Sequence, residues 1–220
     1  MASRRVQFTE GEYYHIYNRG VDKRIIYTSH SEYVRFMAYL VMMNSKQTVR
    51  ADTFLSYSSR TPRDVLSYRI EPLVAIGAFC LMPNHFHLLL TPLCEKGIER
   101  FMHRIGTAYT MFFNTAHERS GSLFQGTYKA VHTSTDRHLK YLYSYIHLNP
   151  ANEKYESSKA LSTALTYKYS SMSEYVTRDF AICDPEKFPK YFMTKQEFVD
   201  LVRNVLEMRD EFRGEAEPSL

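Results

Sequence analysis

The feature that most restricts the fold of this chain is a pair of short apolar segments joined by a tight-turn sequence. Residues 74–82 read VAIGAFCLM and residues 85–91 read HFHLLLT, with Pro83 and Asn84 between them. Apolar runs of this length are typical of buried strands, and a Pro-Asn pair favours a turn. The sequence therefore predicts a buried antiparallel hairpin at this place in the chain.

Hydrophobic periodicity predicts the elements around the hairpin. Aromatic alternation indicates a first strand, and apolar residues at helical spacing indicate three helices, the first capped by Ser31. In chain order we expect a strand at 12–19, a helix at about 32–43, the hairpin, a helix at 98–113, a strand at 126–132 and a helix from 136 to 150. The first six elements have the order of the ferredoxin-like, split βαβ topology. The predicted fold is therefore α+β, with an antiparallel sheet, helices on one side of it, and an additional tyrosine-bearing helix.

The remaining segments have weaker patterns. Residues 44–68 are polar and rich in serine, which predicts a long loop or an insertion, and residues 151–193 predict mostly irregular structure. Thr194 and Glu197 predict a capping box at the start of a last helix. The predicted units are a catalytic domain at 1–150 and a C-terminal appended region at 151–220.

Composition excludes several classes of protein. The chain has 220 residues, of which 44% are hydrophobic and 24% charged, as in ordinary globular proteins. No apolar run approaches the roughly 20 residues of a membrane span, and the N-terminal segment lacks the apolar region of a secretory signal. The three cysteines, Cys80, Cys94 and Cys183, form no cluster, so a disulfide scaffold is not expected. We therefore expect a cytoplasmic protein without a membrane partner.

Charge and aromatic content suggest a nucleic-acid partner without proving one. The net charge is +4, with basic residues in excess at 96–140 and acidic residues in excess at 195–217. A basic middle segment suits a polyanion, although chance scatter of surface charge gives the same pattern. The chain also has 18 tyrosines and 14 phenylalanines, and tyrosine either stacks on bases or packs at a half-exposed surface.

Two histidines, His85 and His87, stand at the start of the second hairpin strand. Side chains at i and i+2 of a strand share one face, so both imidazoles can reach one ion while Phe86 points into the core. Imidazole binds divalent transition metals, and an open coordination position leaves room for a substrate oxygen. A His-x-His pair also occurs without any metal, so the pair alone fits either interpretation.

The predicted helix at 136–150 carries Tyr145 and Asn149 four residues apart, hence on one face. A phenol there can attack a DNA phosphate and release the 3′-hydroxyl, which leaves a 5′-phosphotyrosine. Because a phenol with a pKa near ~10 is a weak nucleophile, a cation held by His85, His87 and Asn149 is expected to polarise the phosphate. The exchange conserves a phosphodiester, and no Walker-type segment appears, so no nucleotide cofactor is expected. The alternative is an amphipathic helix whose tyrosines pack at a rim.

Four blocks of sequence carry a family resemblance: YHIYNRG at 14–20, CLMPNHFHLLLTP at 80–92, SLFQGTYK at 122–129 and YIHLNP at 145–150. Together they resemble the single-tyrosine HUH transposases, especially the REP-associated tyrosine transposases and their insertion-sequence relatives. The resemblance implies a ferredoxin-like catalytic domain that cleaves and rejoins single-stranded DNA with hairpin ends, using a divalent metal ion, Mg²⁺ or Mn²⁺.

The resemblance also implies roles for individual residues. It gives His85 and His87 the role of metal ligands, Tyr145 that of the nucleophile and Asn149 that of a third ligand. In such enzymes the tyrosine helix serves its own subunit or that of a homodimer partner, and the sequence does not decide between these arrangements.

Further polar residues fall within the matching blocks. Asn18, Arg19, Gln125 and Lys129 are interpreted either as contacts with the DNA or as ordinary polarity of turns and strand ends. His15 alternates with two tyrosines and is predicted to be a hydrogen-bonded core histidine rather than a residue of the active side.

Two other functions fit the same features. A ferredoxin-like sheet with exposed aromatics can bind single-stranded nucleic acid without any chemistry. An HUH endonuclease of replication or plasmid transfer is the third candidate, although such enzymes generally carry other domains or a second tyrosine. Because this scaffold hosts many functions, the choice between them depends on the site.

Overall fold

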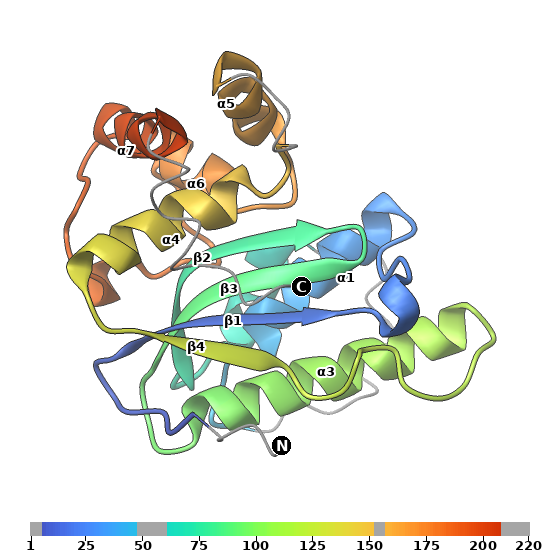
Figure 1. Cartoon of the computed structure of the whole chain (residues 1–220). Helices are drawn as coiled ribbons and strands as arrows, with labels where there is room; N and C mark the ends of the chain where they lie inside the picture. The colour runs from blue at the N-terminus through green and yellow to red at the C-terminus, as the bar shows by residue number, and fades with distance from the viewer. Residues whose placement is uncertain (1–5, 48–60, 152–156, 208–220) are drawn as a thin grey trace.

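A computed structural model of the protein describes residues 6–47, 61–151 and 157–207. They form a four-stranded antiparallel sheet with the strand order β2-β3-β1-β4 (Figure 1). Its elements are β1 (Tyr13–Arg19), α1 (His30–Met42), β2 (Val74–Met82), β3 (His85–Pro92), α3 (Gly97–Ala116) and β4 (Lys129–Thr133). This is the order and pairing of the split βαβ topology, so the predicted ferredoxin-like α+β fold is confirmed.

The described residues also form four more α-helices and three short 3-10 helices. Helix α4 follows β4 directly, and the other α-helices come after it along the chain. Their bounds are α4 (Asp136–Leu148), α5 (Ser157–Thr166), α6 (Met172–Thr177) and α7 (Lys195–Glu207), with η1 (Val21–Lys23), η2 (Pro62–Tyr68) and η3 (Pro185–Lys187). No helix of the described residues has the length and apolarity needed to cross a membrane.

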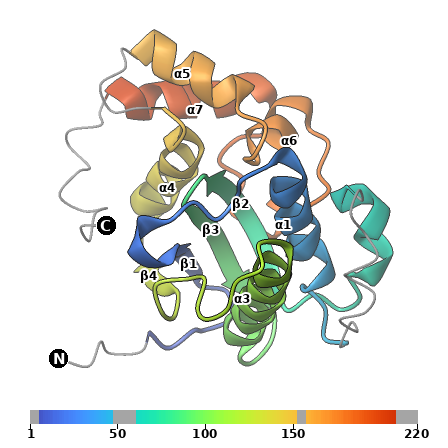
Figure 2. The same cartoon turned by 90° about the vertical axis from the view of Figure 1, so that its right-hand side faces the viewer.

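Strand register gives the sheet two chemically different faces. Ile16 pairs with Leu88, which pairs with Phe79 on its other side, so these three side chains share the apolar face. One residue earlier in β3, His87 is paired with Tyr17, and both project from the opposite side, which we call the histidine face. Helices α1 and α3 cover the apolar face and α4 covers the histidine face, as Figure 2 shows.

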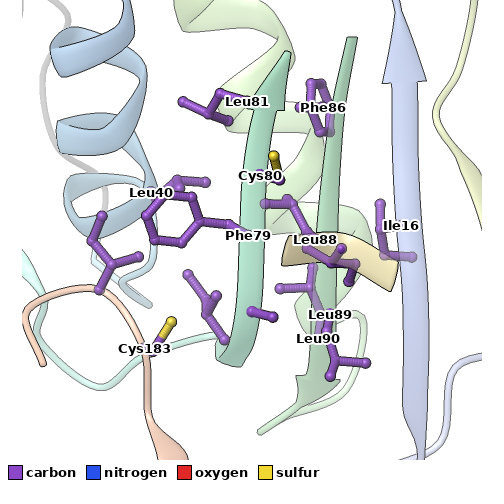
Figure 3. Packing of buried hydrophobic residues seen from close by; sticks show 14 of the residues in the cluster. Ile16, Leu40, Phe79, Cys80, Leu81, Phe86, Leu88, Leu89, Leu90 and Cys183 are labelled. Atoms are coloured by element: carbon purple, nitrogen blue, oxygen red, sulfur yellow. The ribbon is translucent and has the colours of Figure 1, made fainter. Parts of the chain in front are cut away.

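The apolar face holds the main core of the domain. Ile16, Leu88 and Phe36 are fully buried, and the Phe36 ring of α1 lies 5.3 Å from the ring of Phe86 in β3. Figure 3 shows such side chains of the three strands packing together with Leu40 of α1. Since each fully buried side chain of this size contributes roughly 1.5–3 kcal/mol, this face is the main source of the stability of the fold.

The predicted hairpin is confirmed, with β2 ending at Met82 and β3 beginning at His85. Its turn is tied to the segment after β1, since the backbone N–H of Gly20 donates to Asn84 O at 2.9 Å and that of Ile26 to Pro83 O at 2.8 Å. A Cβ atom at position 20 would lie 2.4 Å from Arg24 O, so only glycine fits there. These contacts hold the end of β1 and the start of β3 together, where the two predicted metal-binding histidines begin.

Two predicted boundaries are wrong for local reasons. The N-cap of α1 is Ser29, not Ser31, because this choice places Glu32 at the third helical position, where its carboxylate accepts a hydrogen bond from Thr28 N at 2.6 Å. Strand β4 begins at Lys129 rather than 126, since Gly126 has a φ of +83° and forms a turn instead of extended backbone.

The prediction of mostly irregular structure at 151–193 holds for only part of the described residues of this segment, because α5, α6 and η3 lie in it. Helix α5 buries only the small side chains of Ala160 and Ala164, and α6 has six residues, so neither shows a strong hydrophobic period. Between α5 and α6 the chain pairs with the outer edge of β2, where Leu81 N donates to Tyr169 O at 2.8 Å. The appended region thus covers a sheet edge, and a domain boundary at 150 stays a prediction.

The predictions for the last helix and for the loop at 44–68 have different outcomes. The capping box of the last helix is confirmed, since Glu197 N donates to Thr194 Oγ1 and Thr194 N donates to Glu197 Oε2, both at 3.2 Å. Within the predicted loop at 44–68, residues 48–60 lie outside the described residues, and its last part forms η2.

Candidate active site

The candidate site lies between the histidine face of the sheet and helix α4. The ring of Tyr145 meets the ring of His87 edge-on, with centroids 5.6 Å apart, and lies 5.8 Å from the ring of His15. His85 and His87 are neighbours on β3, with ring centroids 5.1 Å apart. A single chain therefore brings the predicted nucleophile next to the two predicted metal-binding histidines.

Helix α4 owes its position to one apolar stripe and a capped N-terminus. Leu139, Leu142 and Ile146 are buried, and α4 contacts β2 and β3 on one side and α7 on the other. The side chain of Thr135 caps the helix by accepting a hydrogen bond from His138 N at 3.1 Å. Tyr145 directly precedes Ile146, a residue of the buried stripe. The packing that fixes the orientation of the helix therefore also directs the phenol of Tyr145 toward the sheet.

Asn149 stands at the C-terminal end of α4, one turn after Tyr145. Its Nδ2 donates to the backbone oxygen of Tyr145 at 2.9 Å, and its side chain lies near enough to His85 to favour the protonated form of that ring. The amide thus links the tyrosine helix to the histidine strand. Tyr145, Asn149 and His85 therefore form one connected group. His87, the fourth residue predicted for the chemistry, lies beside them.

The Nδ1 atoms of both β3 histidines are engaged by neighbours. His85 Nδ1 lies 2.7 Å from Asn84 Oδ1, and His87 Nδ1 lies 2.8 Å from His15 Nε2. An amide oxygen can only accept, so His85 carries its proton on Nδ1 and keeps the lone pair on Nε2. The Nε2 atom of His87 is buried and has no hydrogen-bond partner among the described residues.

Burial keeps these imidazoles uncharged at neutral pH. It lowers the pKa of His85 to about 4, helped by the nearby charge of Arg19 and opposed by the nearby side chain of Asn149. It lowers the pKa of His15 to about 3 and that of His87 well below its usual value. The neutral form is the one that binds metal ions, because a ligand needs its lone pair.

The donor set fits a divalent cation. A buried, unpaired nitrogen costs about 1–3 kcal/mol, and an ion at His87 Nε2 would remove that cost. His85 and Asn149 offer a second nitrogen and an amide oxygen beside it. Across the described ranges no group of three or more His, Cys, Asp or Glu side chains could hold a metal ion. A site formed by His85 and His87 would therefore need the amide of Asn149 and oxygens of the substrate to complete the coordination of the ion.

Of the residues predicted to contact DNA, two add positive charge to the site. Arg19 is paired with His85 in the β1–β3 register, and its Nε is buried without a partner in the described part of the chain. Lys129 is exposed on β4, with its ammonium group 5.8 Å from the centroid of the Tyr17 ring. Both charges flank the face that carries the histidines, where a phosphate would be attracted.

The other two predicted DNA contacts lie at a turn. Asn18 Nδ2 donates to Gly126 O at 3.2 Å and its Oδ1 accepts from Arg19 N at 2.8 Å, so this side chain holds the turn to the end of β1. The backbone N–H of Gln125 donates to Arg19 O at 2.8 Å, and the residue is exposed. The structure therefore brings these residues beside Arg19, with Asn18 already engaged by the protein.

His15 is the residue of the site that the sequence interpretation missed. It is a buried, hydrogen-bonded histidine, as predicted, but its partner is His87. The alternation of Tyr13, His15 and Tyr17 was the available signal, and it shows only that these side chains share a face. Which face they share depends on the pairing of β1 with β3.

Comparisons with known proteins point in one direction. Residues 66–149, which include His85, His87, Tyr145 and Asn149, match the family of IS200-like transposases. The solved structure of a REP-associated tyrosine transposase bound to a REP hairpin superposes with a TM-score of 0.54 and 13% identity, covering 88% of this chain and 100% of that chain. At this identity the likeness supports the fold alone. No curated protein sequence matches significantly.

Proposed function

We propose that this chain cleaves and rejoins single-stranded DNA, with Tyr145 as the nucleophile, because residues 66–149 match the family of IS200-like transposases. The observation that supports this most directly is the ring of Tyr145 lying 5.6 Å from that of His87 within one chain. The tyrosine then acts on the site of its own subunit, and no exchange of helices between subunits is needed for the chemistry.

The proposed reaction is a transesterification at phosphorus. The phenol oxygen of Tyr145 attacks the phosphorus, the bond to the 3′ oxygen breaks, the phenol loses its proton and the leaving 3′ oxygen gains one. The product is a 5′-phosphotyrosine, and attack by another 3′-hydroxyl reverses the step and joins the strands. One phosphodiester replaces another, so the exchange requires no nucleotide cofactor.

His85, His87 and Asn149 would hold the divalent ion, Mg²⁺ or Mn²⁺. The ion, when bound, polarises the scissile phosphate and stabilises negative charge on its oxygens. The neutral state of both imidazoles supports this assignment, because protonated histidines would repel a cation. Asn84 supports it further by holding the ring of His85 through Nδ1.

The proposed substrate is single-stranded DNA with hairpin ends. The transposase of the matching solved structure was bound to a REP hairpin, and the fold is shared over most of this chain. Arg19 and Lys129 would contact the DNA backbone beside the reacting phosphate, and Gln125 and Asn18 would contact DNA at the neighbouring turn.

The test is formation of a covalent adduct on labelled single-stranded DNA taken from the flanks of the protein's own gene. With Mg²⁺ or Mn²⁺ we expect a protein–DNA band that survives denaturation and disappears with a chelator. Y145F is expected to abolish the band while DNA binding stays near that of the wild type. The matched control is Y141F, one turn earlier, whose ring lies 5.8 Å from that of Tyr145 and which should keep the band.

Two results would contradict the proposal in different ways. An adduct formed by Y145F would remove this residue from the role of nucleophile. A wild-type protein that binds DNA tightly but forms no adduct, with binding unaffected by chelator, would instead identify a non-catalytic binding module.

A further inference from the structure

His15 lies directly behind His87, on the side away from the candidate metal position. The two rings stack with centroids 5.0 Å apart and an interplanar angle of 19°, and Nε2 of His15 lies 2.8 Å from Nδ1 of His87. His15 is 4% exposed and His87 is fully buried. Because both residues are buried, the hydrogen bond between the rings is shielded from competing water.

One proton lies between these two nitrogens when both rings are neutral. A neutral imidazole has one nitrogen that donates and one that accepts, and both rings are buried at this contact. The direction of the hydrogen bond therefore decides the state of the opposite nitrogen of His87. If His87 donates through Nδ1, its Nε2 carries a lone pair; if His15 donates, that Nε2 carries a proton.

Burial of the opposite nitrogen favours donation by His87. A protonated Nε2 of His87 would be a buried N–H group without an acceptor among the described residues, and orphaned buried donors are rare in proteins. No comparable choice exists for His85, since Asn84 Oδ1 only accepts.

Building on the proposed function, we propose that His15 is a positioning residue: it accepts the Nδ1 proton of His87 and thereby presents the Nε2 lone pair of His87 to the metal ion. The hydrogen bond also fixes the plane of the His87 ring. Partners of this kind behind a metal-binding histidine typically change metal affinity by about 10–100-fold when removed.

The first test reads the tautomer directly in the full-length protein without metal or DNA. Long-range ¹H–¹⁵N spectra of histidine-labelled protein distinguish protonated from unprotonated ring nitrogens. We expect His87 to be protonated on Nδ1 and unprotonated on Nε2. A wild-type protein with the proton of His87 on Nε2 overturns the proposal, whatever the activity of the enzyme is.

The second test compares two substitutions of His15 by their affinity for Mn²⁺, measured without DNA by the electron paramagnetic resonance of free Mn²⁺. H15F fills the space but offers no acceptor, so we expect affinity to fall about 10–100-fold. H15Q places an amide oxygen near the position of Nε2 and should restore most of that affinity. The matched control is H132Q, at an exposed histidine of β4 whose ring is hydrogen-bonded to Glu12 and contacts Tyr14, and its affinity should not change.

The outcomes separate this inference from the proposed function. Thermal unfolding shows whether each variant is folded; if H15F is not, the wild-type tautomer and the affinity of H15Q decide. A folded H15F with wild-type affinity for Mn²⁺ overturns the positioning role. If the wild-type protein shows the expected tautomer and affinity but forms no DNA adduct, His15 keeps its role and only the proposed chemistry fails.

Discussion

Both faces of the sheet carry buried side chains, but one face forms the core and the other forms the candidate site. Leu88 and His87 are consecutive residues of β3, both fully buried, and point in opposite directions. Leu88 packs in a core of aliphatic and aromatic side chains, whereas His87 has a buried nitrogen with no partner among the described residues. Burial alone therefore does not separate core from site, and the unsatisfied Nε2 of His87 gains its meaning from the neighbouring His85 and Tyr145.

The contrast has a simple origin in strand geometry. Side chains alternate along a strand, so one β-hairpin can place an apolar set toward α1 and α3 and a polar set toward α4. Substitutions on the apolar face should change mainly the free energy of unfolding, and those on the histidine face mainly the binding of metal and DNA. The following predictions test this separation, in order of expected effect on the free energy of unfolding.

L88A should have the largest effect on stability. Truncating a fully buried leucine typically lowers the free energy of unfolding by about 2–5 kcal/mol, because it leaves a cavity as well as losing apolar burial. Urea denaturation followed by circular dichroism measures this loss. The control is L66A, since Leu66 is 40% exposed and should change little. A loss of Mn²⁺ affinity in folded L88A would contradict the separation of the two faces.

Y109F removes one buried hydrogen bond above the apolar face. The hydroxyl of Tyr109 donates to Ile26 O at 2.6 Å, and the substitution leaves that carbonyl buried without its donor. We expect the free energy of unfolding to fall by about 1–3 kcal/mol, less than for L88A, in the same urea experiment. An unchanged value would show that another donor reaches the Ile26 oxygen.

H85A should lower the stability of the protein only slightly but remove most of its metal binding. His85 is only half-buried, so we expect the free energy of unfolding to change by less than about 1 kcal/mol. Mn²⁺ affinity and adduct formation should both be lost, because a proposed ligand is gone. H132A serves as the control for removing a histidine from the same sheet. Wild-type affinity in H85A would exclude this residue from the metal site.

K129A should have the smallest effect on stability, because Lys129 is exposed. We expect no measurable change in unfolding, but weaker DNA binding and a salt dependence of log K reduced by about 1 if its ammonium contacts one phosphate. Fluorescence anisotropy at several salt concentrations measures both quantities. The control is K46A, whose lysine pairs with Glu71, and an equal effect there would indicate a nonspecific loss of charge.

Much of the domain could be predicted because local patterns determined it. The two strands of the hairpin are uninterrupted apolar runs on either side of Pro83 and Asn84, and helix α3 has a long apolar stripe. Helices α5 and α6 were missed because their buried residues are few or small, as at Ala160 and Ala164, and their stability comes from packing against other elements.

In the candidate site, too, some features follow from local sequence patterns and others do not. That His85 and His87 share a face follows from the two-residue period of a strand, and that Tyr145 and Asn149 share a face follows from the helical turn. These relations hold in any fold that keeps the local elements. The sequence by itself therefore determined which side chains act as pairs.

Only the tertiary structure decided how the pairs meet. The approach of Tyr145 to His87 depends on where α4 packs, and the contact of His15 with His87 depends on the register between β1 and β3. A shift of that register by one residue would send His15 to the apolar face, with no change in the local pattern of either strand. Long-range register is set by the packing of the whole core, which is why no short segment of sequence reveals it.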